Sequence, residues 1–375
     1  MINRISDPDG PKIIVCCGSG GVGKTTLSAA IGLYGALSGK KTIVLTIDPA
    51  RRLADSLGLK DFNVDAQRVP LEQLSDIPRP FEGQLYAMML DAKRTFDNLI
   101  FRHAPADLTK NIFKNRYYQH LSNNMAGSHE YMAMEKLYEI YHQDKYDLIV
   151  LDTPPSRRAL DFLEAPGKLL NLLGHNFFLK MFRPYLHAGR LGMRVFNILA
   201  YPVLRAVGKV IGKQVLEDLA GFMQLWNDVL FEGFSRRAET VKTLLSGNMT
   251  LFLAIATPQH LPMTEAVFLY EKLSRNNMPF GGFIINRVHV LENQELFDTD
   301  RHGMAEFFNK KSIDDRLAEK LGITFNNYMK MSESDAHAIN DLINKIGSNV
   351  DILQIPVAEG EIAHLNDLVR LSRMF

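Results

Sequence analysis

Residues 13 to 28 read IIVCCGSGGVGKTTLS, and this stretch decides the fold. It matches the phosphate-binding template G-x-x-x-x-G-K-[ST]. The template positions are Gly18, Gly23, Lys24 and Thr25. An apolar, β-branched run, Ile13 to Val15, precedes the glycines, and a helical pattern of small residues, Leu27 to Leu37, follows them. A strand, a glycine-rich loop and a helix in this order predict a loop that wraps around phosphate.

The residue types in this loop suit a nucleoside triphosphate with Mg²⁺. Glycines let successive backbone N–H groups turn toward an anion, and the start of the helix adds partial positive charge. Lys24 can reach the β- and γ-phosphates, and the Thr25 hydroxyl can join the ligand shell of Mg²⁺. We therefore expect ATP and Mg²⁺ as cofactors. The expected nucleotide-binding residues of the loop are Gly20, Gly21, Val22, Gly23, Lys24, Thr25 and Thr26.

Composition places the chain among ordinary soluble proteins. It has 375 residues, of which 46% are hydrophobic, enough for a large core without cross-links. Its net charge of +1 gives no general attraction to nucleic acid, so we expect no nucleic-acid partner. Cys16 and Cys17 are adjacent in the first strand, point to opposite faces and cannot build a disulfide framework. The N-terminus lacks an apolar signal region, and no apolar run approaches a bilayer span. We expect a cytoplasmic protein.

Strand signals recur along the chain with room for helices between them. Such alternation predicts an α/β fold of the P-loop NTPase type, with a mostly parallel, doubly wound sheet. We expect one domain over residues 1–375 with helical insertions at about 92–146 and 161–248. The predicted strands are Ile13 to Cys17, Thr42 to Ile47, Leu85 to Leu90, Asp147 to Leu151, Thr250 to Ile255, Gly282 to Ile285 and Asp351 to Ile355.

Two aspartates follow the second strand in the segment IDPARRLADSLG, residues 47 to 58. Asp48 lies at the carboxyl end of a strand, the edge where open α/β sheets bind ligands, and Asp55 comes one or two helical turns later. One carboxylate could hold a water of the Mg²⁺ shell, and the other could orient the attacking water. Capping of a helix is the alternative role for Asp48.

A third aspartate ends the fourth strand, in DLIVLDTPPSRRAL. Four apolar residues before Asp152 match a Walker B strand, whose carboxylate positions Mg²⁺. Pro154 and Pro155 stiffen the following loop, so it can move as a unit when the γ-phosphate leaves. Arg157 and Arg158 are either a solvated surface pair or cations near phosphate.

Together these motifs resemble the anion-transporting ATPases, which include arsenical pump-driving ATPases and the cytosolic ATPases that target tail-anchored membrane proteins. The resemblance rests on GSGGVGKTT, DPARRLADSLG, DTPPSRRAL, ATPQHLPMTEA and GGFIINRV, and extends from about Ile13 to Leu371. It implies that Asp48 and Asp55 form switch I, with Asp55 orienting the water, and that Asp152 begins switch II. It also implies contacts with the nucleotide from Asn286, Arg287 and Pro356, with the Asn286 amide on the adenine edge.

The chain departs from the family in three places. Ser19 stands where the family usually has a lysine that reaches the partner's phosphates, so ATP should drive dimer closure less strongly. Arg157 and Arg158 stand where Gly and His are usual. No C-x-x-C pair is present, so we expect a homodimer without zinc. Cys16 and Cys17 alone do not supply the clustered thiolates of an arsenite sensor.

The segment from Pro166 to Leu216 has a composition of its own. It contains eight basic residues and no Asp or Glu, interleaved with aromatic side chains. We weigh three interpretations: a solvated face of a helical insertion, a groove for an apolar client helix, and a basic surface on anionic headgroups. The basic residues are Lys168, Lys180, Arg183, Arg190, Arg194, Arg205, Lys209 and Lys213.

We therefore expect a Mg-ATP-dependent ATPase whose nucleotide state controls a helical subdomain that binds a hydrophobic or membrane-associated client. Two alternatives stay open: a nucleotide switch that places proteins at a membrane or cell pole, and a nucleotide-binding scaffold with little turnover.

Overall fold

The computed structural model describes residues 2–47, 52–59, 65–74, 82–103, 109, 113, 128–155, 232–291, 314–358, 360, 362 and 364–375. The fold divides into two compact units. The first consists of Met1–Met88, Tyr146–Arg157 and Leu245–Phe375, and the second of Met89–Lys145 and Arg158–Leu244. The second unit is built from the two intervals where the sequence predicts helical insertions. That the whole chain behaves as one domain stays a prediction.

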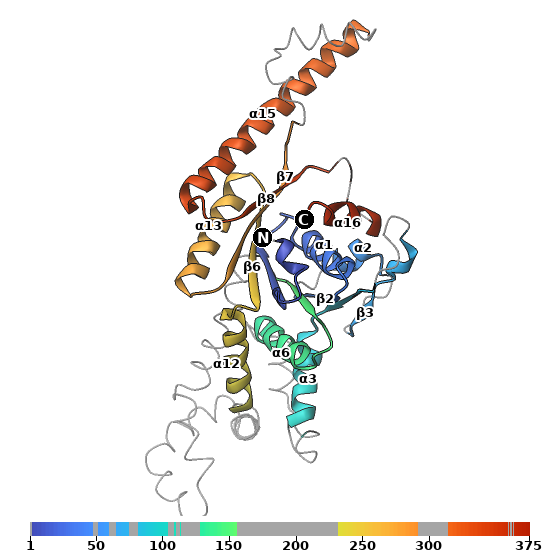
Figure 1. Cartoon of the computed structure of the whole chain (residues 1–375), viewed down its shortest axis with the longest axis vertical. Helices are drawn as coiled ribbons and strands as arrows, with labels where there is room; N and C mark the ends of the chain where they lie inside the picture. The colour runs from blue at the N-terminus through green and yellow to red at the C-terminus, as the bar shows by residue number, and fades with distance from the viewer. Residues whose placement is uncertain are drawn as a thin grey trace, which may run out of the picture. The chain divides into compact units, whose positions relative to one another are not determined.

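An eight-stranded sheet forms the centre of the first unit, in the order β3-β4-β2-β5-β1-β6-β7-β8 (Figure 1). The pairs β2–β5, β5–β1, β1–β6, β6–β7 and β7–β8 are parallel, which confirms the predicted fold class. All seven predicted strands are present, and the short antiparallel β3 was not predicted. The strands are β1 (Ile13–Gly18), β2 (Lys41–Thr46), β3 (Gln67–Arg68), β4 (Gln84–Met89), β5 (Leu148–Asp152), β6 (Thr250–Ala256), β7 (Phe280–Val288) and β8 (Ile352–Pro356).

Helices cover this sheet on both sides, with α1 and α16 on one side and α13 on the other (Figure 1). The 32-residue helix α15 packs against α13. Within the described residues, no helix combines the length and the apolar character that crossing a bilayer requires. The helical segments of this unit are η1 (Ile2–Ile5), α1 (Lys24–Leu37), α2 (Arg52–Leu57), η2 (Leu71–Gln73), α13 (His260–Arg275), α15 (Asp315–Ile346) and α16 (Leu365–Ser372).

Close packing holds α1 against the sheet. Every residue of β1 is buried, as expected for a central parallel strand with both faces covered. A Cβ added to Gly32 would lie 2.3 Å from a methyl group of Val44, and one added to Gly35 would lie 2.5 Å from a methyl group of Leu148. The small residues of α1 therefore let its axis approach the sheet closely and fix the direction in which the helix leaves the loop.

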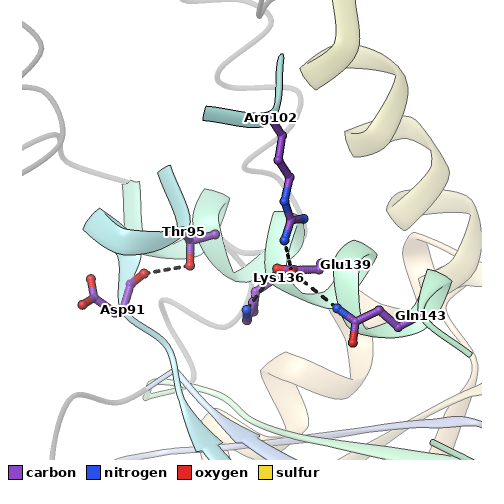
Figure 2. Close-up of polar contacts among 6 residues, drawn as sticks. All are labelled: Asp91, Thr95, Arg102, Lys136, Glu139 and Gln143. Atoms are coloured by element: carbon purple, nitrogen blue, oxygen red, sulfur yellow. Dashed lines mark hydrogen bonds and ion pairs between the residues drawn. The ribbon is translucent and has the colours of Figure 1, made fainter. Parts of the chain in front are cut away.

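In the second unit the described helices are α3 (Ala92–His103), α6 (Ser128–His142) and α12 (Glu232–Ser246), whose last two residues belong to the first unit. Helix α3 packs on α6. Figure 2 shows Glu139 as the point where polar contacts converge. Its carboxylate accepts hydrogen bonds from Arg102 of α3 at 2.7 Å, from Lys136 at 3.0 Å and from Gln143 at 3.4 Å. Of these contacts, the one from Arg102 links α3 to α6, and the other two hold the Glu139 carboxylate within α6.

A second carboxylate of α6, Glu135, pairs with Arg237 of α12 at 2.7 Å, and both side chains are at most 10% exposed. Burial raises the pKa of Glu135 to about 7, although the charge and hydrogen bond of Arg237 work in the opposite direction. Burial also opposes the charge of Glu139, but the hydrogen bonds from Arg102 and Lys136 outweigh it and hold the pKa of Glu139 below its ordinary value. The pKa values of two carboxyl groups one helical turn apart are thus shifted in opposite directions.

Candidate active site

The loop between β1 and α1 has the backbone of a phosphate-binding loop. Gly21 and Gly23 have φ values of +81° and +92°, in the left-handed region that side chains disfavour. Gly23 is the residue before α1, and its carbonyl accepts the first helical hydrogen bond, from Leu27 N at 2.9 Å. The two glycines turn the chain sharply enough for the helix N-terminus to face the loop.

Two features of this loop fit an anionic ligand. A Cβ added to Gly20 or Gly21 would meet no described atom within 4 Å, so packing within the protein does not explain these glycines. Ser19 is only 8% exposed, and its hydroxyl has no hydrogen-bond partner among the described residues. A buried hydroxyl beside an open glycine cradle suits a ligand that brings acceptor oxygens, as phosphate does.

Lys24 lies across the loop. Its side chain is 8% exposed, and Nζ donates a hydrogen bond to the Ser19 carbonyl at 2.8 Å. Because the lysine spans from the helix start to the first residue of the loop, its charge is held over the cradle. A cation in this place is suited to neutralise phosphate oxygens.

The Walker B aspartate lies beside the loop helix. Asp152 ends β5, is fully buried, and its Oδ2 accepts hydrogen bonds from Thr25 Oγ1 at 2.8 Å and from Thr46 Oγ1 at 2.9 Å. The strand register places Asp152 level with Cys16 of β1 and Thr46 of β2. The predicted pair of metal-ligand candidates, Thr25 and Asp152, is therefore in direct contact. Thr46 was not predicted, although it ends its strand at the same edge.

The segment after Asp152 is tied back to β1. Thr153 Oγ1 donates to the Cys16 carbonyl at 2.8 Å, and Thr153 N donates to the same oxygen at 3.3 Å. These bonds fix the start of the predicted switch, and Pro154 and Pro155 then reach the surface. Arg157 and Arg158 lie outside the described residues.

Asn286 approaches the loop from β7. Its Nδ2 donates to the Val22 carbonyl at 2.8 Å, and its Oδ1 accepts from Arg287 N at 3.0 Å. Arg287 is exposed, with φ of +59°, and the pairing of β7 with β8 shifts register there. Pro356 is exposed at the end of β8, level with Val288. The structure thus brings Asn286 to the loop, and the roles of these three residues toward a nucleotide stay predictions.

Of the switch I aspartates, only Asp55 lies among the described residues. It is exposed in the first turn of α2, a helix that packs against α1 and α16. Asp48 lies outside the described residues. Thr26 is half-buried in the first turn of α1. The catalytic roles of Lys24, Asp48 and Asp55 and the metal-binding roles of Thr25, Asp48 and Asp152 stay predictions.

Both cysteines are buried in β1. Burial raises the pKa of Cys17 to about 12 and that of Cys16 well above its ordinary value, so both are thiols at neutral pH. Because soft metals and arsenite bind thiolates, burial makes both side chains poor ligands for them.

Comparison with known proteins agrees with this site. The family model for anion-transporting ATPases matches residues 11–332. "ATPase ASNA1 homolog 1" of Paramecium tetraurelia is 25% identical over 339 residues, which cover 88% of this chain and 90% of the relative. "ATPase GET3" of Komagataella phaffii is 26% identical over 308 residues, 78% of each chain. "Putative arsenical pump-driving ATPase 2" of Aquifex aeolicus is 26% identical over 297 residues, 78% of this chain and 86% of the relative. A match of this extent, on a chain that carries the P-loop and the Walker B aspartate, shows that it belongs to the anion-transporting ATPase family and is an ATPase.

Proposed function

We propose that this protein hydrolyses Mg-ATP at the loop between β1 and α1, and that the nucleotide state controls a helical unit that binds a hydrophobic or membrane-associated protein client. The hydrogen bond from Thr25 to Asp152, beside the Lys24 side chain, is the observation that carries the catalytic part. A hydroxyl and a carboxylate in contact at the start of the loop helix are the donor pair that P-loop enzymes offer to Mg²⁺.

The residues present fit Mg-ATP. The backbone of Gly20 to Thr26 would hold the phosphates, with Lys24 supplying positive charge, and Thr25, Asp48 and Asp152 would hold the metal. Mg²⁺ would neutralise charge on the phosphate oxygens. Asp55 is exposed, so its carboxylate could accept a hydrogen bond from a water and hold that water in line with the γ-phosphate. Catalysis in this scheme is positioning and electrostatics.

The client part of the proposal rests on family membership and on the segment Pro166 to Leu216, which lies outside the described residues. Relatives named ATPase GET3 and ATPase ASNA1 homolog support an ATPase of the protein-targeting kind more than an arsenical pump, because the two cysteines here are buried thiols. We propose an apolar client helix, such as the anchor of a tail-anchored protein, and a homodimer held without zinc. A basic surface on anionic membrane headgroups is the alternative to this client interpretation.

Two substitutions test the chemistry. Lys24→Ala should weaken nucleotide binding and turnover together, because the lysine charge would stabilise the phosphates both in the bound nucleotide and in the transition state. Asp55→Asn should bind Mg-ATP as the parent does and lose most turnover, because only the orientation of the water is removed. Equal turnover in Asp55→Asn and the parent would remove Asp55 from the mechanism.

A deletion tests the client. Removing Gly174 to Arg205 should abolish capture of a protein that copurifies with the Asp55→Asn form, while Mg-ATP binding is retained. Capture that fades as ionic strength rises above about 0.15 M would indicate headgroup attraction instead, since the Debye length there is roughly 8 Å. Client capture equal to that of the full chain would show that the deleted segment is scaffold.

A further inference from the structure

Strand β7 extends past its neighbour β6 at the carboxyl edge of the sheet. The last pair between them is Ala256 with Ile285, so Asn286 is the first residue of β7 beyond β6. Strand β6 lies between β7 and β1, and the β1–β6 pairing ends one residue earlier on β6, at Gly18 with Ile255. The side chain of Asn286 can therefore cross the end of β6 and reach the loop that follows β1.

Both ends of the Asn286 amide are engaged there. Nδ2 donates to the Val22 carbonyl at 2.8 Å, a contact between residues 264 positions apart in sequence. A Cβ added to Gly23 would lie 2.4 Å from the same Nδ2. Glycine is thus favoured at position 23 for two independent reasons: a side chain would clash with Asn286, and the φ of +92° is left-handed.

The neighbouring residue holds the amide in this orientation. Arg287 N donates to Asn286 Oδ1 at 3.0 Å, and Arg287 itself adopts a left-handed φ of +59° at the register shift between β7 and β8. An arginine in that conformation is strained, and such strain persists where surrounding contacts require it. With Oδ1 turned toward the Arg287 amide, Nδ2 is left to face Val22.

We propose that Asn286 is a positioning residue for phosphate binding: its amide holds the P-loop at Val22 and Gly23, so that the loop is shaped before the nucleotide arrives. This rests on the proposed function of the loop as the nucleotide site. An amide NH₂ has two donors and its oxygen two acceptor sites, so one of each is left for a nucleotide base. Holding the loop is a separate role from reading the base, and the two roles predict different results with ligands that have no base.

Binding of Mg-ATP, Mg-GTP and magnesium tripolyphosphate by isothermal titration calorimetry separates the two roles. Asn286→Ala removes the amide, and Asn286→Asp keeps its shape while placing an acceptor against the Val22 carbonyl. Asn276→Ala is a matched control, because Asn276 Nδ2 also donates to a backbone carbonyl, that of Lys272, at 2.8 Å and lies at the end of α13. Melting temperatures of the unliganded variants report the stability cost in each case.

Both Asn286 variants should weaken all three ligands by a similar factor, on the order of tenfold, with Asn276→Ala unchanged. Tripolyphosphate binding equal to that of the parent, with loss of the preference for ATP over GTP, would overturn the proposal and leave Asn286 as a base reader. Unchanged binding of every ligand would overturn it as well. If the parent and Lys24→Ala bind ATP equally, the proposed function fails instead, so the two failures are distinguishable.

A stability cycle gives a readout that needs no ligand. Gly23→Ala should lower the melting temperature more in the parent than in Asn286→Ala, because the second background removes the atom that the new methyl group would meet. The left-handed strain at position 23 is present in both backgrounds and cancels. Equal losses in the two backgrounds would show that Asn286 does not bear on the loop.

Discussion

Two threonines that donate to one carboxylate oxygen offer a matched test of the metal site. Thr25 Oγ1 and Thr46 Oγ1 lie 2.8 and 2.9 Å from Asp152 Oδ2, and Asp152 is fully buried. A hydrogen bond to a charged group contributes about 1.5–3 kcal/mol, and valine keeps the shape of threonine. We therefore expect Thr25→Val and Thr46→Val each to lower the free energy of unfolding by about 2 kcal/mol.

The two variants should differ in their response to Mg²⁺. Thr25 is half-buried on the loop helix next to Lys24, whereas Thr46 is fully buried at the end of β2 and belongs to neither the loop nor its helix. ADP affinity measured by calorimetry with Mg²⁺ and with EDTA gives the metal-dependent gain for each protein. That gain should disappear in Thr25→Val and persist in Thr46→Val. Affinity in EDTA should stay close to that of the parent in both variants.

If Thr25→Val keeps its full metal-dependent gain, the Thr25 hydroxyl serves only to hold Asp152, and its predicted role at the metal is refuted. If Thr46→Val loses the gain to the same extent, Asp152 needs both hydroxyls to act, and the predicted difference between the two threonines is refuted. A stability loss confined to one variant would contradict the expectation of similar losses, which rests on the similar hydrogen-bond lengths of 2.8 and 2.9 Å.

Three further outcomes are expected. Gly18→Ala should cost about 1–3 kcal/mol in urea unfolding, because the new Cβ would lie 2.2 Å from the Ile255 carbonyl oxygen. Gly360→Ala should cost little, because its Cβ would meet no described atom within 4 Å. Glu135→Gln should gain stability relative to the parent by up to ~3 kcal/mol between about pH 5 and about pH 8. The pKa of Glu135 is 4.5 in the unfolded chain and about 7 in the folded protein, so the carboxyl group ionises first in the unfolded chain as pH rises. The parent therefore loses stability between pH 4.5 and about pH 7, whereas the glutamine variant does not. Ser19 leaves no lysine to reach a partner's phosphates, so ultracentrifugation should show little change in assembly on adding Mg-ATP, and a monomer converted completely to a dimer would contradict this.

The elements that could be predicted are those with a local signal. Apolar runs bounded by glycine or charge marked seven strands, and the P-loop template marked the start of α1 within three residues, Leu27 against Lys24. β3 escaped prediction because it has only two residues, Gln67 and Arg68, and neither is apolar. A strand that short takes its conformation from its pairing with β4, not from its own sequence.

Contacts between distant segments could not be predicted in the same way. Lys24, Thr25 and Asp152 were found because each stands at a fixed place in a motif. Thr46, by contrast, is separated from Asp152 by 106 residues, and Asn286 from Val22 by 264. Nothing in the sequence around Thr46 or Asn286 indicates these partners. For Asn286 the family resemblance predicts a contact with adenine, and the structure adds the contact with the Val22 carbonyl.

Strand order accounts for the assembly of the site. The chain leaves β1 toward β2 on one side and later returns to place β6 on the other, so β1 lies where the direction of winding changes. β5 lies between β1 and β2, and the register sets Asp152 level with residues of both strands. The carboxylate therefore meets the helix that follows β1 and the threonine that ends β2, at the edge where parallel sheets bind ligands. A different position for β5 would leave every motif intact and separate Asp152 from Thr25, so the motifs identify the chemistry and the topology makes it possible.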